Sequence, residues 1–260
     1  MFKKNKYRKL GFSRSQVARF RRMNFTQETE VKFGSKQIKI TNPYWFLHSI
    51  DELFIDQLYK FESSVTNPFI FDCGANWGLS LIFFKQLYPN SEIIAYEPDP
   101  EIFKILTENI SRHNFRGIQL ENKAVWKADT ELTFAPDGGL GGSIKELGIK
   151  RKREIKIQAI RLKNELTRYE AIEFLKMDIE GAEYEVLNDC KNNLSHVQNM
   201  FVEYHSIRGQ TQQLDQILLI VKEAGFRYYI KEAWNNMPHP FTANKDISYD
   251  LQLNIFCYRV

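Results

Sequence analysis

The alternation of short apolar runs with helical segments after residue 68 constrains the fold of this chain most. We predict seven strands, over residues 69–73, 92–97, 118–125, 171–178, 200–204, 226–231 and 251–258. Helical patterns follow four of these strands, over residues 78–88, 100–113, 181–192 and 211–224. Strands that alternate with helices of about 10–15 residues indicate parallel βαβ units. The sequence therefore predicts an α/β three-layer sandwich with a mostly parallel seven-stranded sheet that ends in an antiparallel hairpin.

The positive charge of the chain, +4 overall, is concentrated at its start. Residues 1–27 contain nine lysines or arginines and no acid, which leaves 27 basic against 32 acidic residues elsewhere. We expect residues 1–47 to form a basic N-terminal extension, and residues 48–260 to form the main domain with a β insertion at about 130–162. The extension is either frayed and solvated or in contact with an anionic partner. We expect it to be dispensable for cofactor binding, so that a chain starting near Phe33 binds the cofactor normally.

The composition also argues against several classes of protein. No apolar run approaches the roughly 18–20 residues needed to cross a bilayer. The basic start has no apolar segment behind it that would make it a secretory signal. Cys73, Cys190 and Cys257 lack metal-ligand spacing, so we expect neither a disulfide framework nor a zinc site. These features predict a cytoplasmic protein without a transmembrane segment.

Polar residues follow the first three predicted strands, where open α/β sheets bind their ligands. We expect seven of them to bind a cofactor: Asp72, Gly74, Asn76, Gly78, Glu97, Asn122 and Ala124. The two glycines permit close approach of the backbone, and Glu97 is placed to accept hydrogen bonds from both hydroxyls of a ribose. The turn lacks the G-x-G-x-x-G spacing of dinucleotide-binding proteins. The alternative interpretation is a plain glycine turn beside a surface glutamate.

Four segments together resemble the successive motifs of the FkbM methyltransferases. They are residues 71–78 (FDCGANWG), 95–98 (AYEP), 121–125 (ENKAV) and 176–183 (KMDIEGAE), of which the last is the most specific to that family. The resemblance runs from about Ile50 to Val221. It implies a Rossmann-like fold, S-adenosylmethionine as the cofactor, and methylation of a hydroxyl on a sugar or natural product. The chain departs from the family at Leu162-Lys163, where Leu-Asp is common, and its basic head lies outside the resemblance.

A hydroxyl acceptor becomes a good nucleophile only when a base takes its proton. Asp178, Glu180, Glu203 and His205 follow or end two neighbouring predicted strands, so we expect them to border one pocket. We favour Asp178 and Glu180 as carboxylates that orient the acceptor and His205 as the base. We predict a site without metal, the rival being a divalent cation held by two carboxylates and the histidine. The glycine-rich segment 138–143 is either a hairpin tip or a lid over the acceptor.

Two further functions compete with O-methylation of a small-molecule or glycan acceptor. One is a nucleic-acid methyltransferase guided by the basic head, which also suits peripheral contact with an anionic surface. Base N-methylases usually carry N/D-P-P-Y/F where this chain has Asp178-Ile-Glu-Gly, so we do not expect a nucleic-acid partner. The other is a catalytically inactive Rossmann-like binding module. The intact set of Asp72, Gly74, Gly78 and Glu97 argues against it.

Overall fold

A computed structural model describes residues 5–23, 27–136, 142–144, 147, 153–242 and 247–260 of the chain. Its main sheet has seven strands in the order β12-β13-β11-β10-β3-β4-β5. Their bounds are β3 (Phe69–Cys73), β4 (Glu92–Tyr96), β5 (Ile118–Glu121), β10 (Ile172–Met177), β11 (Val197–Ile207), β12 (Arg227–Trp234) and β13 (Tyr249–Tyr258). The first five of these run parallel, and β13 is antiparallel to both of its neighbours. The predicted mostly parallel seven-stranded sheet with an antiparallel hairpin is confirmed.

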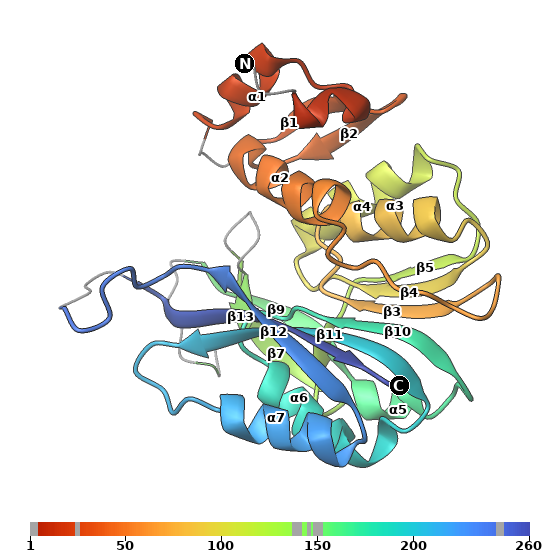
Figure 1. Cartoon of the computed structure of the whole chain (residues 1–260), viewed down its shortest axis with the longest axis vertical. Helices are drawn as coiled ribbons and strands as arrows, with labels where there is room; N and C mark the ends of the chain where they lie inside the picture. The colour runs from red at the N-terminus through yellow and green to blue at the C-terminus, as the bar shows by residue number, and fades with distance from the viewer. Residues whose placement is uncertain (1–4, 24–26, 137–141, 145–146, 148–152, 243–246) are drawn as a thin grey trace.

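Helices cover both faces of this sheet (Figure 1). One face carries α3 (Leu79–Leu87) and α4 (Pro100–Ser111), and the other carries α5 (Leu162–Leu166), α6 (Glu183–Cys190) and α7 (Leu214–Glu223). Alternate side chains of a strand point to opposite faces. In β3, Phe71 and Cys73 enter one buried cluster, with α6 and α7, while Ile70 enters the other, with α3 and α4. The apolar sequence of β3 thus reflects burial on both faces.

The N-terminal region is part of the packed body. It contains the 3₁₀ helix η1 (Lys6–Leu10), α1 (Arg14–Phe20), β1 (Thr29–Phe33), β2 (Lys36–Ile40) and α2 (Pro43–Ile50). These elements lie beyond α3 and α4 in Figure 1. Phe12, Phe20 and Phe33 pack against Phe46 of α2, within the same buried cluster as α3 and α4. The interpretation of a frayed head is therefore wrong for the described residues 5–23.

The sequence pattern predicts a break at Asn42-Pro43 and a helix over residues 48–62, but the helix begins five residues earlier, as α2. Asn42 accepts hydrogen bonds from the backbone N–H groups of Tyr44 and Trp45, and Pro43 occupies the first turn. Both features favour a helix start. The Asn-Pro pair therefore follows the end of β2 and also begins α2. The helix continues as the π-helix η2 (Asp51–Ile55) and crosses the predicted boundary at residue 47.

The β insertion forms a separate four-stranded sheet in the order β6-β9-β7-β8. Its strands are β6 (Ala124–Trp126), β7 (Thr130–Ala135), β8 (Ser143–Ile144) and β9 (Ile155–Arg161). The strand predicted over residues 118–125 is thus two strands, β5 and β6, which belong to different sheets. The glycine-rich segment 138–143 lies outside the described residues except for Gly142 and Ser143, so neither interpretation of it is tested.

The described part of the chain contains no helix that is long and apolar enough to cross a bilayer. Cys73, Cys190 and Cys257 are free thiols, and all three are buried in the core. Cys73 lies in β3 and Cys257 in β13, where each acts as a small residue of the buried core.

Candidate active site

A cavity of about 460 Å³ lies at the carboxyl ends of the parallel strands. It is lined by residues that follow β3, β4 and β10 and by residues of β11, together with parts of α2, η2 and the β12–β13 hairpin. The chain connections diverge between β3 and β10, because β4 and β5 extend the sheet on one side and β11 on the other. Open α/β sheets bind ligands at such a switch point. The volume is typical of small-molecule sites, which span roughly 300–1,000 Å³.

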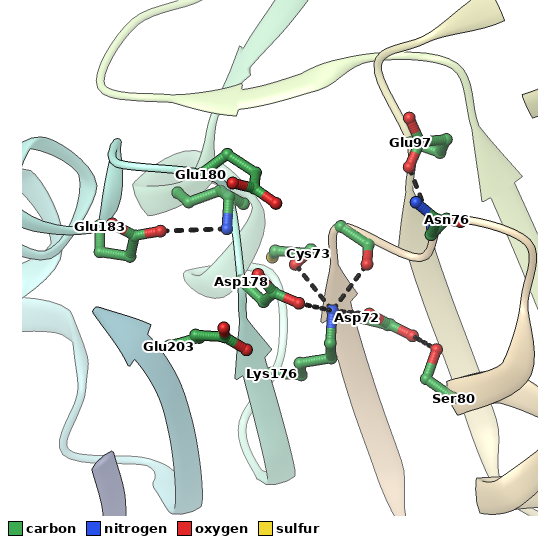
Figure 2. Close-up of polar contacts among 12 residues, drawn as sticks. Asp72, Cys73, Asn76, Ser80, Glu97, Lys176, Asp178, Glu180, Glu183 and Glu203 are labelled. Carbon is green, nitrogen blue, oxygen red and sulfur yellow. Dashed lines mark hydrogen bonds and ion pairs between the residues drawn. The ribbon is translucent and has the colours of Figure 1, made fainter. Parts of the chain in front are cut away.

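Glu97, directly after β4, forms one end of this cavity. Its carboxylate accepts hydrogen bonds from the backbone N–H groups of Asn76 and Asp99, each at 2.9 Å (Figure 2). The side-chain amide of Asn122 donates a hydrogen bond to the Glu97 carbonyl at 2.8 Å, which stabilises the turn after β4. Burial raises the pKa of Glu97 to about 8, although the two backbone amides act in the opposite direction. The cavity therefore contains a fixed carboxyl group that has lost most of its solvation.

Gly74 allows two strand ends to touch. Its φ is +95°, and a Cβ atom there would lie 2.0 Å from the backbone oxygen of Asp178. Gly78 has φ +88°, and its Cβ would meet Leu106 of α4 at 2.7 Å. Both positions favour glycine because of backbone conformation and close packing. Close packing against β10 and α4 thus accounts for both glycines, and their approach to a ligand stays a prediction.

A buried ion pair lies beneath the Gly74 turn. Lys176 of β10 places Nζ 3.2 Å from Asp72 and 3.4 Å from Asp178, and it donates a hydrogen bond to the Gly74 carbonyl at 2.6 Å (Figure 2). Ser80 donates to the other oxygen of Asp72. Burial alone would lower the pKa of Lys176, but the Asp72 and Asp178 carboxylates outweigh it and hold the pKa above its ordinary value. Lys176 therefore stays charged and ties β3 to β10 directly under the cavity.

His205 of β11 lies among carboxylates at the other end of the cavity. Its Nδ1 is 3.0 Å from an oxygen of Glu183, and its Nε2 is 3.5 Å from Glu203 and 3.6 Å from Glu180. Glu183 also accepts two backbone N–H groups of the turn between β10 and α6. Because Glu183 is an acceptor at every contact, Nδ1 of His205 is the donor, and Nε2 is directed toward Glu180 and Glu203.

Burial and crowding of like charges displace the pKa values of this cluster. Burial raises the pKa of Glu180 and of Glu203, and the nearby Asp178 raises both further. Burial, together with Asp178, also raises the pKa of Glu52, from η2, to about 7. Burial lowers the pKa of His205, but the surrounding carboxylates outweigh it and hold that pKa well above its ordinary value. The carboxylates of this cluster therefore favour the protonated form of the imidazole.

Glu180 sits on a strained turn that directs it into the cavity. Its φ is +58°, and Gly181 follows with φ +101°. Positive φ is uncommon for a residue with a side chain, and such strain is often found at functional sites. The Tyr249 hydroxyl donates a hydrogen bond to Glu180 at 2.9 Å. Glu180 does not cap the following helix, since α6 begins at Glu183 without a side-chain cap.

Three rings from distant parts of the chain meet on the cavity wall. Trp45 and His48 belong to α2, and Trp234 ends β12. The ring centroid of Trp234 lies 5.2 Å from that of Trp45 and 5.3 Å from that of His48. The N-terminal region and the C-terminal hairpin therefore build one side of the cavity together.

The structure brings most of the predicted site residues to the cavity wall. Those that line it are Gly74, Asn76, Glu97, Ala124, Asp178, Glu180, Glu203 and His205. Asp72, Gly78 and Asn122 lie behind the wall, where they anchor Lys176, pack against α4 and hold the Glu97 turn. The proposed site thus divides into residues that can touch a ligand and residues that position them.

Three contributors were not singled out from the sequence. Lys176 carried a signal, because a lysine inside an otherwise apolar strand needs a buried partner. Glu183 lies within the quoted segment 176–183, yet nothing local connects it to His205. Glu52 gave no signal, since its entry into the cavity depends on where η2 packs.

The chain matches the methyltransferase FkbM domain over residues 72–228, which is more than half of its length. It is 28% identical over 187 residues to Methyltransferase 1 of Beauveria bassiana, covering 63% of this chain and 74% of that one. It is 26% identical over 156 residues to the 2-O-methyltransferase NoeI of Sinorhizobium fredii, covering 53% and 63%. It is 24% identical over 210 residues to the 31-O-demethyl-FK506 methyltransferase FkbM of Streptomyces tacrolimicus, covering 67% and 79%. The chain therefore belongs to the FkbM methyltransferase family, with a Rossmann-like fold and S-adenosylmethionine as its cofactor.

Proposed function

We propose that this protein is an O-methyltransferase that methylates a hydroxyl of a glycan or secondary metabolite. Two of the relatives support oxygen as the acceptor atom, because one is named a 2-O-methyltransferase and the other is named for 31-O-demethyl-FK506. The observation that carries the proposal is the layout of the cavity. A fixed carboxyl group, Glu97, lies at one end, and a buried cluster of carboxylates around His205 lies at the other.

The Glu97 end of the cavity suits the cofactor. Glu97 is only 6% exposed, lines the cavity, and is held by two backbone amides, so it can accept hydrogen bonds from the ribose hydroxyls without reorganising. Gly74 and Asn76 line the adjoining turn, and Ala124 lines the wall beside it. We assign these four residues to cofactor binding, with Asp72, Gly78 and Asn122 as residues that position them. When bound, the cofactor supplies an electrophilic methyl group on a sulfonium.

The opposite end must orient a hydroxyl and receive its proton. Asp178 and Glu180 both line the cavity, and we assign them to hydrogen bonds from the acceptor. His205 was expected to act as the base, but the surrounding carboxylates raise its pKa and favour its protonated form. Glu203, 3.5 Å from Nε2 of His205, is the better acceptor there. In this scheme Glu203 would take the proton of the acceptor oxygen as that oxygen takes the methyl group. The carbon–sulfur bond of the sulfonium would break, which leaves a neutral thioether, and His205 would orient the Glu203 carboxylate.

The test uses methyl-labelled S-adenosylmethionine with a panel of sugars, oligosaccharides and hydroxylated natural products. We expect a labelled product whose methyl group resists mild alkali, as an ether does. Glu203→Gln and Asp178→Asn should lose roughly a hundredfold in turnover, in the range of general base catalysis, while calorimetry shows unchanged cofactor affinity. A base-labile methyl ester, an N-methyl product, or full turnover in both variants would contradict the proposal.

A further inference from the structure

Three side chains of two neighbouring strands converge with metal-ligand chemistry. Glu203 and His205 are two positions apart on β11, so they point to the same face of the sheet. Asp178 directly follows β10, which pairs in parallel with β11. One ligand atom from each of these residues lies within 4.8 Å of the other two. The three ligand atoms, one each from Asp178, Glu203 and His205, therefore lie close enough to one another to bind the same ion.

The orientation of His205 resembles that of a metal ligand. The side chain is 4% exposed, and its Nδ1 is fixed by the carboxylate of Glu183. Metal-binding histidines commonly donate one ring nitrogen to a carboxylate, which directs the other toward the metal. Among the described residues, Nε2 of His205 makes no hydrogen bond, and it faces Glu203 and Glu180 at 3.5 and 3.6 Å. A buried ring nitrogen is thus aimed at a group of carboxylates without a hydrogen bond of its own.

The carboxyl groups at the His205 end of the cavity favour the binding of a cation. Asp178, Glu180 and Glu203 bring three carboxyl groups together. Lys176 contacts Asp178 at 3.4 Å and also Asp72, and His205 faces Glu180 and Glu203 at 3.6 and 3.5 Å. Carboxylates crowded in a poorly solvated pocket repel one another unless a positive charge lies between them. A dication between Asp178 and Glu203 would remove most of that repulsion.

We propose that Asp178, Glu203 and His205 bind a divalent cation, with Mn²⁺ held more tightly than Mg²⁺. Carboxylate and imidazole donors suit such ions. Two ligand atoms on opposite sides of an octahedral ion lie roughly 4.2 Å apart, given bonds of about 2.1 Å, so small side-chain rotations close the site. Nε2 then binds the ion as neutral imidazole, and its proton is released.

The role of the ion rests on the proposed function, whereas its binding does not. Three protein ligands leave coordination positions open toward the cavity. An acceptor hydroxyl in one of them would be oriented, and its pKa would be lowered by the ion. Because Glu203 would then be a ligand of the ion, the hydroxyl proton would pass to Glu180 in its place.

The first experiment measures Mn²⁺ binding to the chelator-treated full chain by electron paramagnetic resonance, without cofactor or acceptor. We expect one ion per chain and at least tenfold weaker binding in Asp178→Asn, Glu203→Gln and His205→Ala. Glu52→Gln removes a carboxylate that lines the same cavity without being a ligand, and it should change the affinity less than threefold. Equal losses in Glu52→Gln and the ligand variants would mean that negative potential alone attracts the ion, which would overturn the site.

Glu183 provides a second measurement that does not depend on removing a ligand. Glu183→Ala leaves Nδ1 of His205 without its acceptor and should weaken Mn²⁺ binding by about tenfold. Glu183→Gln can still accept from Nδ1 and should restore most of the affinity. Cofactor binding by calorimetry checks that each variant is folded. No Mn²⁺ binding at millimolar concentration in the wild type would refute the site even if methyl transfer occurs, whereas binding without methyl transfer would refute only the proposed function.

Discussion

Cofactor affinity should depend on pH through Glu97. Burial raises the pKa of this carboxyl group to about 8 in the free protein. Ribose hydroxyls donate hydrogen bonds, so they favour the ionised carboxylate, and its pKa must be lower in the complex. Binding therefore releases a proton, and affinity for S-adenosylmethionine rises as pH increases toward 8. Since each pH unit below the pKa costs a factor approaching ten, affinity should fall about fiftyfold between pH 8 and pH 6.

Calorimetry in two buffers with different ionisation enthalpies measures both the dissociation constant and the proton release. Glu97→Ala should cost about 1.5–3 kcal/mol of binding at pH 8 because two hydroxyls lose their acceptor. Glu97→Gln should bind weakly and lose most of the pH dependence, and what remains reports the ionisable groups of the cofactor itself. Glu203→Gln serves as the control that retains the Glu97 slope. A flat affinity between pH 6 and 8, or an unchanged slope in Glu97→Gln, would refute the ribose assignment.

Three further predictions follow from the packing. Gly74→Ala should lower the free energy of unfolding by about 2 kcal/mol or more, because the new Cβ would lie 2.0 Å from the Asp178 carbonyl oxygen. Urea denaturation measures this loss, and a value below about 0.5 kcal/mol would contradict the prediction. A chain starting at Phe33 should lose its cooperative thermal transition or show a much lower midpoint, because the buried Phe12 and Phe20 are removed, which reverses the expectation that it binds normally. Trp234→Ala should raise KM for the acceptor with little change in kcat if the ring contributes uniform binding, and an unchanged KM would exclude contact with the acceptor.

The local pattern of the sequence determined the main sheet. Apolar runs of strand length separated by amphipathic helices have one compact solution, in which helices cover a mostly parallel sheet. Polar residues at the strand ends then had to gather on one edge, which is why Glu97, Asp178 and His205 could be placed around one cavity in advance. Asn42 and Pro43 were interpreted as a break, since the same pair can end a strand or begin a helix.

Contacts between distant segments were decided only by the tertiary structure. The pairing of Lys176 with Asp72 depends on strands that are far apart in sequence lying side by side in the sheet. The raised pKa of His205 depends on carboxylates from the turn after β10, from α6 and from β11, and no spacing rule relates these segments. The basic head resembled a solvated tail because nine basic residues dominate its pattern, yet Phe12 packs against Phe46 in a buried cluster. Burial and long-range proximity set the energies of all three features, and neither quantity is encoded in a local pattern.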